Sequence, residues 1–251
     1  MKYLLRKPNI WYRNNPPMST KQADDLITFL IIGIIVGGRL GFVFFYQPSY
    51  FLNNPFEILV VWKGGMSFHG GLIGVIFASI WFCKRNSLSL YKIGDLIAVC
   101  TPPGLFLGRI ANFINNELWG KPTDFFFGVI FPGPLAQKCL GFSSPCSRHP
   151  SQLYEAALEG VLLGFLMLWL TLNRFWFKKP GSLSGFFLFF YGLSRFTVEF
   201  VRQPDIYYVS NENPMGYLFN LGFFNLTMGQ TLSIPMIVFG LLMLIRRTHY
   251  D

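Results

Sequence analysis

The stretch LITFLIIGIIVGGRLGFVFFY, residues 26–46, decides the class of this protein. It holds a single charged residue, Arg39, and it is long enough to cross a hydrocarbon core of about 30 Å, which takes around 20 helical residues. The whole chain has the same character, because 52% of its 251 residues are hydrophobic and only 13% are charged, against about a quarter in a soluble domain. The sequence therefore predicts an integral membrane protein.

Six apolar stretches are predicted to be transmembrane helices: residues 26–46, 69–83, 93–114, 152–172, 183–201 and 232–245. The fold class is then all-α, a polytopic helix bundle that forms one membrane domain over residues 1–251 with no soluble domain. The second and sixth stretches are short for a span. Pro102 and Pro103 interrupt the third stretch, and prolines inside a helix predict a kink there.

The positions of the basic residues predict how these spans are oriented. Thirteen of the 21 Lys and Arg residues fall before the first span, after the second and fourth spans, and after the last. By the positive-inside rule, both termini are cytoplasmic. The loops 47–68, 115–151 and 202–231 then face outward, and 115–151 is long enough to be a functional periplasmic region. This pattern explains the net charge of +9 better than nucleic-acid binding does.

Four arginines lie in or beside the predicted spans: Arg39, Arg109, Arg195 and Arg202. An arginine at the centre of a bilayer costs about 2.5 to 3.5 kcal/mol on insertion scales, so these residues are expected to face a polar cavity and to hold an anion. A rise of about 1.5 Å per residue places the first three about 18 to 24 Å from the inner ends of their helices. Too few acids are expected nearby to neutralise every arginine.

Two polar stripes fall at this depth, because residues three and four apart share one face of a helix. The fifth span presents Tyr191, Arg195, Glu199 and Arg202, and the end of the third span presents Arg109, Asn112, Asn116 and Glu117. One interpretation is an intrahelical ion pair between Arg195 and Glu199 that only eases insertion. The other is a shared binding site in the outer leaflet, which two stripes at one depth favour.

Several longer motifs accompany these stripes. They are HGGLIG (69–74), GRIANFINNELWG (108–120), RHPSQLYE (148–155) and YGLSRFTVEFVRQPD (191–205), with GGRLGFVFFY (37–46) and MGQTLSIPM (228–236). On these residues the chain resembles the bacterial prolipoprotein diacylglyceryl transferases, from about residue 24 to its end. The resemblance implies transfer of a diacylglyceryl group from phosphatidylglycerol to the lipobox cysteine thiol of a prolipoprotein, with release of glycerol phosphate. It also implies a transferase of the bacterial inner (cytoplasmic) membrane that carries out the first step of lipoprotein maturation, with its site toward the periplasm.

The resemblance links seven positions with activity or lipid binding: His69, Arg109, Asn112, Glu117, Tyr191, Arg195 and Glu199. Arg109 and Arg195 are expected to hold the phosphate leaving group, because the planar guanidinium binds phosphate oxygens through two donors. Tyr191 is expected to donate to a phosphate or glyceryl oxygen. His69 is the general-base candidate for the thiol, since its pKa lies near the working pH. The alternative is that His69 only donates a hydrogen bond to a neighbouring helix.

The remaining candidates concern lipid binding. Arg202 is expected to guide the headgroup, Asn112 and Asn116 to hold the loop or the headgroup, and Glu117 and Glu199 to orient the arginines. Three further residues of the RHPSQLYE motif, Gln152, Tyr154 and Glu155, serve either the site or helix packing. The chemistry requires no cofactor and no metal, and His69, His149 and His249 show no ligand spacing. Cys139 and Cys146 share an outward loop, either as a disulfide or as two thiols.

The chain departs from the family pattern at its start. The family has seven spans, and MKYLLRKP, residues 1–8, is expected to match the cytoplasmic end of a first helix that carries a functional tyrosine. The start is then assigned too far downstream or the protein is truncated. The competing functions are an inactive truncated homologue and a small anion or lipid transporter. The absence of an inverted repeat and the gathering of polar residues in one leaflet disfavour the transporter.

Overall fold

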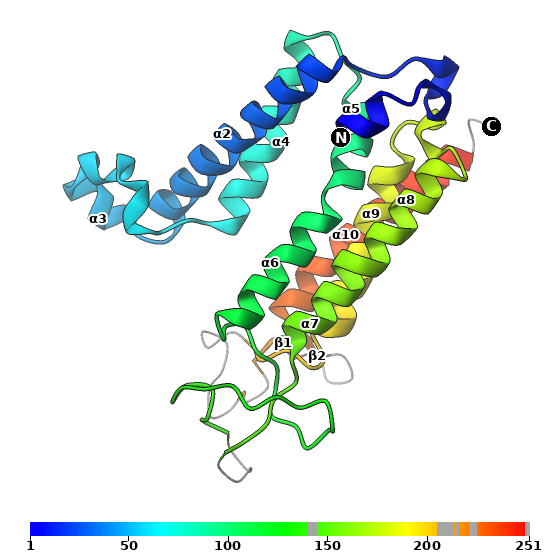
Figure 1. Cartoon of the computed structure of the whole chain (residues 1–251). Helices are drawn as coiled ribbons and strands as arrows, with labels where there is room; N and C mark the ends of the chain where they lie inside the picture. The colour runs from blue at the N-terminus through cyan, green and yellow to red at the C-terminus, as the bar shows by residue number, and fades with distance from the viewer. Residues whose placement is uncertain (140–144, 205–212, 214–215, 221–224, 249–251) are drawn as a thin grey trace. The chain divides into compact units, whose positions relative to one another are not determined.

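The structure is a computed structural model of the chain, and it describes residues 1–139, 145–204, 213, 216–220 and 225–248. Two residues singled out in the sequence, Asp205 and His249, lie outside these ranges. The chain divides into two compact units, Met1–Leu96 and Ile97–Asp251, and each is described by itself (Figure 1). The predicted single membrane domain stays a prediction.

The first unit is built on a helical hairpin. Helices α2 (Thr20–Phe45) and α4 (Phe68–Arg85) lie side by side (Figure 1). Helix α2 begins at a capping box, in which Ser19 and Gln22 exchange backbone-to-side-chain hydrogen bonds. Short helices precede and connect the pair: α1 (Lys2–Leu5), η1 (Pro8–Ile10), η2 (Tyr12–Asn14), α3 (Pro48–Asn53), η3 (Pro55–Leu59) and η4 (Val61–Lys63).

Glycines allow the two helices to approach closely. A Cβ atom on Gly33 would lie 2.6 Å from the carbonyl oxygen of Gly74, and one on Gly41 would lie 2.7 Å from the Cα atom of Gly70. Gly37 lies between them at the same four-residue spacing. Lipid offers no hydrophobic force that would press helices together, so backbone contact between small residues supplies the packing in a membrane.

Gly37→Ala is therefore expected to destabilise the hairpin by about 1 to 3 kcal/mol, the usual cost of overpacking. The added Cβ would lie 2.8 Å from the Cα atom of Gly74, where only backbone could give way. The measurement is the midpoint of thermal unfolding in detergent. Gly71→Ala is the matched control, because its Cβ would lie 3.7 Å from the nearest atom, and an unchanged midpoint for Gly37→Ala would contradict the close contact.

The second unit contains the helices that carry most of the candidate site. The predicted third span is two helices, α5 (Leu90–Cys100), which begins in the first unit, and α6 (Pro102–Ile114). They are divided at Thr101 before the two prolines, so the predicted interruption is confirmed. The fourth span is α7 (Ser151–Glu155), the π-helix η5 (Ala156–Leu162) and α8 (Leu163–Leu172). π-Helical turns are rare and occur frequently at functional sites.

Two further helices complete the second unit. After η6 (Trp176–Lys178), helix α9 (Ser182–Val198) lies against α10 (Met228–Thr248). Their contact also depends on glycine, since a Cβ on Gly240 would lie 2.5 Å from the backbone nitrogen of Phe189. A short antiparallel hairpin, β1 (Tyr217–Asn220) and β2 (Asn225–Thr227), lies in the predicted outward loop 202–231. The all-α prediction did not include this hairpin.

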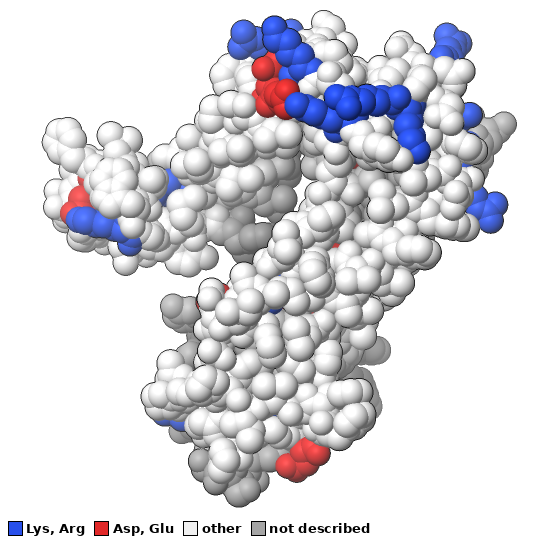
Figure 2. All heavy atoms as spheres, viewed as in Figure 1, with Lys and Arg blue, Asp and Glu red and all other residues white. Residues whose placement is uncertain are grey.

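The prediction of an all-α polytopic membrane protein is confirmed. Four helical stretches are long and apolar enough to cross a membrane: Thr20–Phe45, Leu90–Ile114, Ser151–Leu172 and Met228–Arg246. Helices α4 and α9 form where the second and fifth spans were predicted, but their crossing stays a prediction. Charged side chains gather toward the ends of the helices and the long flanks are almost free of them (Figure 2), as lipid contact requires.

Candidate functional site

A buried carboxylate, Glu155, forms the centre of the candidate site in the second unit. Its side chain is 2% exposed at the end of α7, and three arginines from other parts of the chain reach it. Arg109 Nε on α6 lies 2.8 Å from Oε2, Arg195 Nη1 on α9 donates directly to Oε1, and Arg202 Nη1 lies 3.8 Å from Oε1. The arginines of the two predicted stripes therefore belong to one cluster, which we call the arginine cluster.

Two more acids complete the arginine cluster. Arg109 Nη2 lies 3.7 Å from Glu159 Oε2, and Arg195 Nη2 lies 3.4 Å from Glu199 Oε2. Neither oxygen of the fully buried Glu159 has a hydrogen-bond partner among the residues that the structure describes. Three glutamates thus face three arginines. The expectation that acids would be too few to neutralise the arginines is wrong, because Glu155 and Glu159 had not been counted.

The start of α10 holds Glu199 in place. Thr227 Oγ1 donates to Glu199 Oε1 over 3.1 Å. Thr227 and Gln230 form the reciprocal bonds of a capping box, with the Thr227 N–H donating to Gln230 Oε1 and the Gln230 N–H donating to Thr227 Oγ1. A Cβ on Gly229 would lie 2.5 Å from the Glu199 carboxyl carbon, so a larger residue here would displace this carboxylate. These contacts explain why Thr227, Gly229 and Gln230 stand at their positions in the sequence.

Glu117 lies in the loop after α6 and accepts hydrogen bonds from side chains of α6 and of its own loop. Its carboxylate Oε1 accepts hydrogen bonds from Asn112 Nδ2 over 2.9 Å and from Asn115 Nδ2 over 3.4 Å. Gln152 Nε2 donates to the Glu117 carbonyl over 2.6 Å, so Gln152 serves packing. The Glu117 carboxylate thus accepts from these two amides through one oxygen, and its role in orienting an arginine stays a prediction.

Two residues of this loop adopt left-handed backbone conformations. Asn116 has φ of 56° and donates from Nδ2 to the Ile114 carbonyl, while Leu118 has φ of 59°. Asparagine tolerates this region, but leucine does so at a cost of order 1 to 3 kcal/mol. Strained residues persist where the surroundings fix them, and here Ser151 Oγ donates to the Leu118 carbonyl over 3.0 Å. Residues 116–118, at the start of the loop after α6, are therefore tied to α7 beside the cluster.

The segment around Gly120 borders the cluster. Lys121 Nζ donates to the Phe200 carbonyl over 2.9 Å, and burial lowers the pKa of this lysine although Glu199 opposes the shift. His149 Nδ1 lies 3.3 Å from Tyr154 Oη. Burial lowers the pKa of the His149 imidazole, and the nearby charge of Lys121 lowers it further, which favours the neutral ring.

Tyr191 lies one helical turn before Arg195 on α9, so the two side chains share a face. Its ring stacks on Phe187 with centroids 5.7 Å apart. His69 lies in the first unit, on the first turn of α4, where its side chain is exposed. Its role as general base therefore stays a prediction.

Arg39, also in the first unit, does not have the role that its position suggested. Its side chain is buried, and its guanidinium donates to five backbone carbonyls at 2.6 to 3.2 Å. The acceptors are Glu57, Ile58, Val60, Gly64 and Gly65. A guanidinium has five N–H groups, so no donor remains for an anion. The expectation that Arg39 holds an anion is wrong, because this residue ties the 57–65 segment to α2.

Sequence reasoning left Glu155 undecided and missed Glu159. The signal was present, because two acids four residues apart in an apolar span must pair with cations to be tolerated in a membrane. Which cations they meet depends on how three helices pack. That contact cannot be read from spacing along one helix.

The sequence of the chain is similar to that of known proteins. The family model for prolipoprotein diacylglyceryl transferase matches residues 2–246 of the chain. The chain belongs to this family. A phosphatidylglycerol–prolipoprotein diacylglyceryl transferase from Ruegeria pomeroyi is 55% identical over 96% of this chain and 82% of its own length. Proteins of the same name from Roseobacter denitrificans and Nitratidesulfovibrio vulgaris (strain DP4) are 51% and 48% identical, over 98% and 89% of this chain and 83% and 77% of their own lengths.

Membership gives the cluster a chemical context. Members are named for moving a diacylglyceryl group, and the chain is accordingly a transferase of the membrane. The family motifs at 108–120, 148–155 and 191–205 supply Arg109, Glu155, Arg195, Glu199 and Arg202, which the second unit brings together. Family motifs far apart in the sequence thus meet at one buried carboxylate.

Proposed function

We propose that this protein transfers the diacylglyceryl group of phosphatidylglycerol to the lipobox cysteine thiol of a prolipoprotein and releases glycerol phosphate. The observation that carries the proposal is the convergence of Arg109, Arg195 and Arg202 on Glu155 in a member of this family. The names of its relatives state both substrates. The reaction forms a bond between the thiolate sulfur and the glyceryl carbon and breaks the bond from that carbon to the phosphate oxygen.

The arginines meet the electrostatic demand of this step. Negative charge develops on the departing phosphate, and donors aimed at such an oxygen in a site without water stabilise the transition state. Three contacts in the cluster are long, Arg195 to Glu199 at 3.4 Å, Arg109 to Glu159 at 3.7 Å and Arg202 to Glu155 at 3.8 Å, so these guanidinium groups can turn toward phosphate oxygens. Tyr191 is proposed to donate to a phosphate or glyceryl oxygen, and Asn112 to hold the headgroup.

The thiol proton requires an acceptor. A thiol with a pKa of about 8.5 is mostly protonated at neutral pH, and only the thiolate attacks. His69 is proposed as the general base, since an imidazole titrates near the working pH. Glu199 and Glu155 are proposed to orient the arginines, a role that their contacts support.

The substrate test compares two lipids that differ in the phosphate. Phosphatidylglycerol is expected to support transfer to a lipobox cysteine peptide in detergent, whereas diacylglycerol is expected to give no product, because it offers the arginines no phosphate and has no good leaving group. The measurement is the mass of the lipidated peptide. Equal product from diacylglycerol would remove the basis for a phosphate site.

The protein is proposed to lie in the inner membrane with the arginine cluster toward the periplasm. The support is the distribution of basic residues, which favours cytoplasmic loops after α4 and α8. A reporter that is active only in the periplasm should be active when fused after residue 135 and inactive when fused after residue 178. The reverse pattern would place the cluster on the cytoplasmic side.

A further inference from the structure

Arg148 is a buried arginine that lies outside the predicted spans and outside the arginine cluster. Arg148 is 3% exposed, just before α7. Its Nε donates to the Ala136 carbonyl over 2.5 Å, and its Nη2 to the Lys138 carbonyl over 2.9 Å. Its Nη1 donates to the Gly120 carbonyl over 3.2 Å and to Gln203 Oε1 over 3.1 Å. One guanidinium thus joins three separate parts of the chain.

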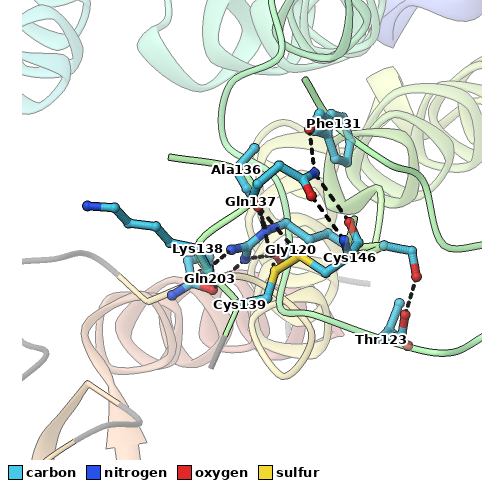
Figure 3. Close-up of a disulfide and its surroundings, with 11 residues drawn as sticks. Gly120, Thr123, Phe131, Ala136, Gln137, Lys138, Cys139, Cys146 and Gln203 are labelled. Atoms are coloured by element: carbon cyan, nitrogen blue, oxygen red, sulfur yellow. Dashed lines mark hydrogen bonds between the residues drawn. A yellow bond between two sulfur atoms is a disulfide. The ribbon is translucent and has the colours of Figure 1, made fainter. Parts of the chain in front are cut away.

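Figure 3 shows how two of these acceptors are held. The disulfide between Cys139 and Cys146 closes the loop directly beside Lys138. The amide of Gln137 spans the same loop, since its Nε2 donates to the Phe131 carbonyl over 2.8 Å and its Oε1 accepts from the Cys146 N–H over 2.9 Å. The carbonyls of Ala136 and Lys138 lie on either side of Gln137 and face Arg148. The disulfide therefore restrains the two carbonyls that accept hydrogen bonds from the Arg148 guanidinium.

The segment around Gly120, which also accepts from Arg148, connects this arrangement with the arginine cluster. Residues 120 and 121 lie between the 148–149 segment and the end of α9. The Gly120 N–H donates to the His149 carbonyl, and the Lys121 N–H donates to the Val201 carbonyl, both over 2.8 Å. A Cβ on Gly120 would lie 2.6 Å from each of these carbonyl oxygens, so the three segments are as close as backbone allows.

This arrangement also fixes the backbone of Arg202. Its backbone pairs with Gly120 in an isolated bridge, and the neighbouring Gln203 binds Arg148. Its guanidinium has the longest contact to Glu155 of the three arginines, 3.8 Å, so its place depends on the backbone that carries it. A shift of the 201–203 segment would therefore move the Arg202 guanidinium more than those of the other two arginines.

We propose that Arg148 is a positioning residue that fixes Arg202 in the arginine cluster, and that the Cys139–Cys146 disulfide holds the carbonyls that bind Arg148. The proposal rests on the proposed function and on the expectation from the sequence that Arg202 guides the lipid headgroup. Lysine cannot replace Arg148, because it lacks the planar set of five donors that reaches three segments at once. Reduction of the disulfide should weaken the same arrangement and loosen Arg202, while the contacts of Arg109 and Arg195 with Glu155 stay unchanged.

The kinetic test is a double-mutant cycle between Arg148→Lys and Arg202→Gln. Arg148→Lys should raise the KM for phosphatidylglycerol about tenfold with kcat within about threefold, since headgroup guidance is a binding contribution. In the Arg202→Gln background the same change should add less than about twofold, because its effect passes through Arg202. A full tenfold increase in both backgrounds would overturn the proposal. Gln203→Ala, which removes one acceptor, should shift KM in the same direction if Arg148→Lys fails to fold.

A second measurement does not depend on transfer activity. Hydrogen exchange of the backbone amides in 119–123 should become at least about tenfold faster in Arg148→Lys, while that of α6 and α9 stays unchanged. A phosphine reductant should accelerate exchange in the wild type but not in the Cys139→Ala/Cys146→Ala double variant, whose exchange is already fast. Unchanged exchange in 119–123 would overturn the proposal whatever the activity. Faster exchange in a wild type that transfers no lipid would instead overturn the proposed function alone.

Discussion

Arg195→Lys is expected to lower the turnover of diacylglyceryl transfer about 100-fold or more, which corresponds to about 2.7 kcal/mol of transition-state stabilisation. Lysine keeps the charge but loses the planar pair of donors, and Arg195 uses Nη1 for Glu155 and Nη2 toward Glu199. A single ammonium cannot hold Glu155 and a phosphate oxygen together. Since the grip tightens as charge develops on the leaving group, the loss should fall on kcat more than on lipid affinity.

The rate should be measured at saturating phosphatidylglycerol, after the variant has been shown to insert and to unfold at the wild-type temperature. Arg174→Lys is the matched control, because Arg174 is exposed after α8 and contacts the ring of Trp169 away from the cluster. Its turnover should equal that of the wild type. Wild-type turnover in Arg195→Lys would reduce Arg195 to an ion-pair partner and leave Arg109 as the candidate for the leaving group.

Glu155→Gln is expected to have the largest effect on stability and to abolish transfer. Glu155 is 2% exposed and meets Arg109, Arg195 and Arg202, so its loss leaves buried positive charge without its central partner. Breaking a buried ion pair from one side typically costs about 3 to 5 kcal/mol. Thermal unfolding in detergent measures the first effect, and lipidation of a cysteine peptide measures the second.

Glu159→Gln provides the matched control on the same span. Glu159 is fully buried, but its only ion-pair contact among the described residues is 3.7 Å long and its oxygens accept no hydrogen bond there. The change should therefore cost less stability than Glu155→Gln and leave measurable transfer. Equal losses in the two variants would show that total charge matters and that Glu155 has no central role.

The helices could be predicted from the sequence because their signal is local. The stretch 26–46 lies in one helix, α2, and the prolines at 102 and 103 mark where α5 gives way to α6. The π-helix over Ala156–Leu162 and the hairpin of β1 and β2 could not be predicted in this way. A π-turn preserves the apolar pattern of a span, and a hairpin this short has too few alternating residues to stand out.

The site was predictable in part. Helical spacing placed Arg195 and Glu199 on one face, and they do form an ion pair. The same reasoning failed for Arg39, whose partners are backbone carbonyls of a loop, and carbonyls are present in every sequence. It also did not anticipate that Glu117 accepts hydrogen bonds from two nearby amides. Contacts within one helix follow from periodicity, whereas contacts between helices and loops follow from tertiary packing.

The equal number of arginines and glutamates in the cluster has a consequence for product release. With all six groups ionised, the described cluster is formally neutral before lipid binds. A phosphodiester brings one negative charge, which three nearby guanidinium groups can share. The glycerol phosphate that remains after cleavage is a monoester and carries about −1.5 to −2 at pH 7. We therefore expect the three glutamates to limit how tightly the arginines hold the doubly charged product, so that the grip that tightens in the transition state does not trap glycerol phosphate.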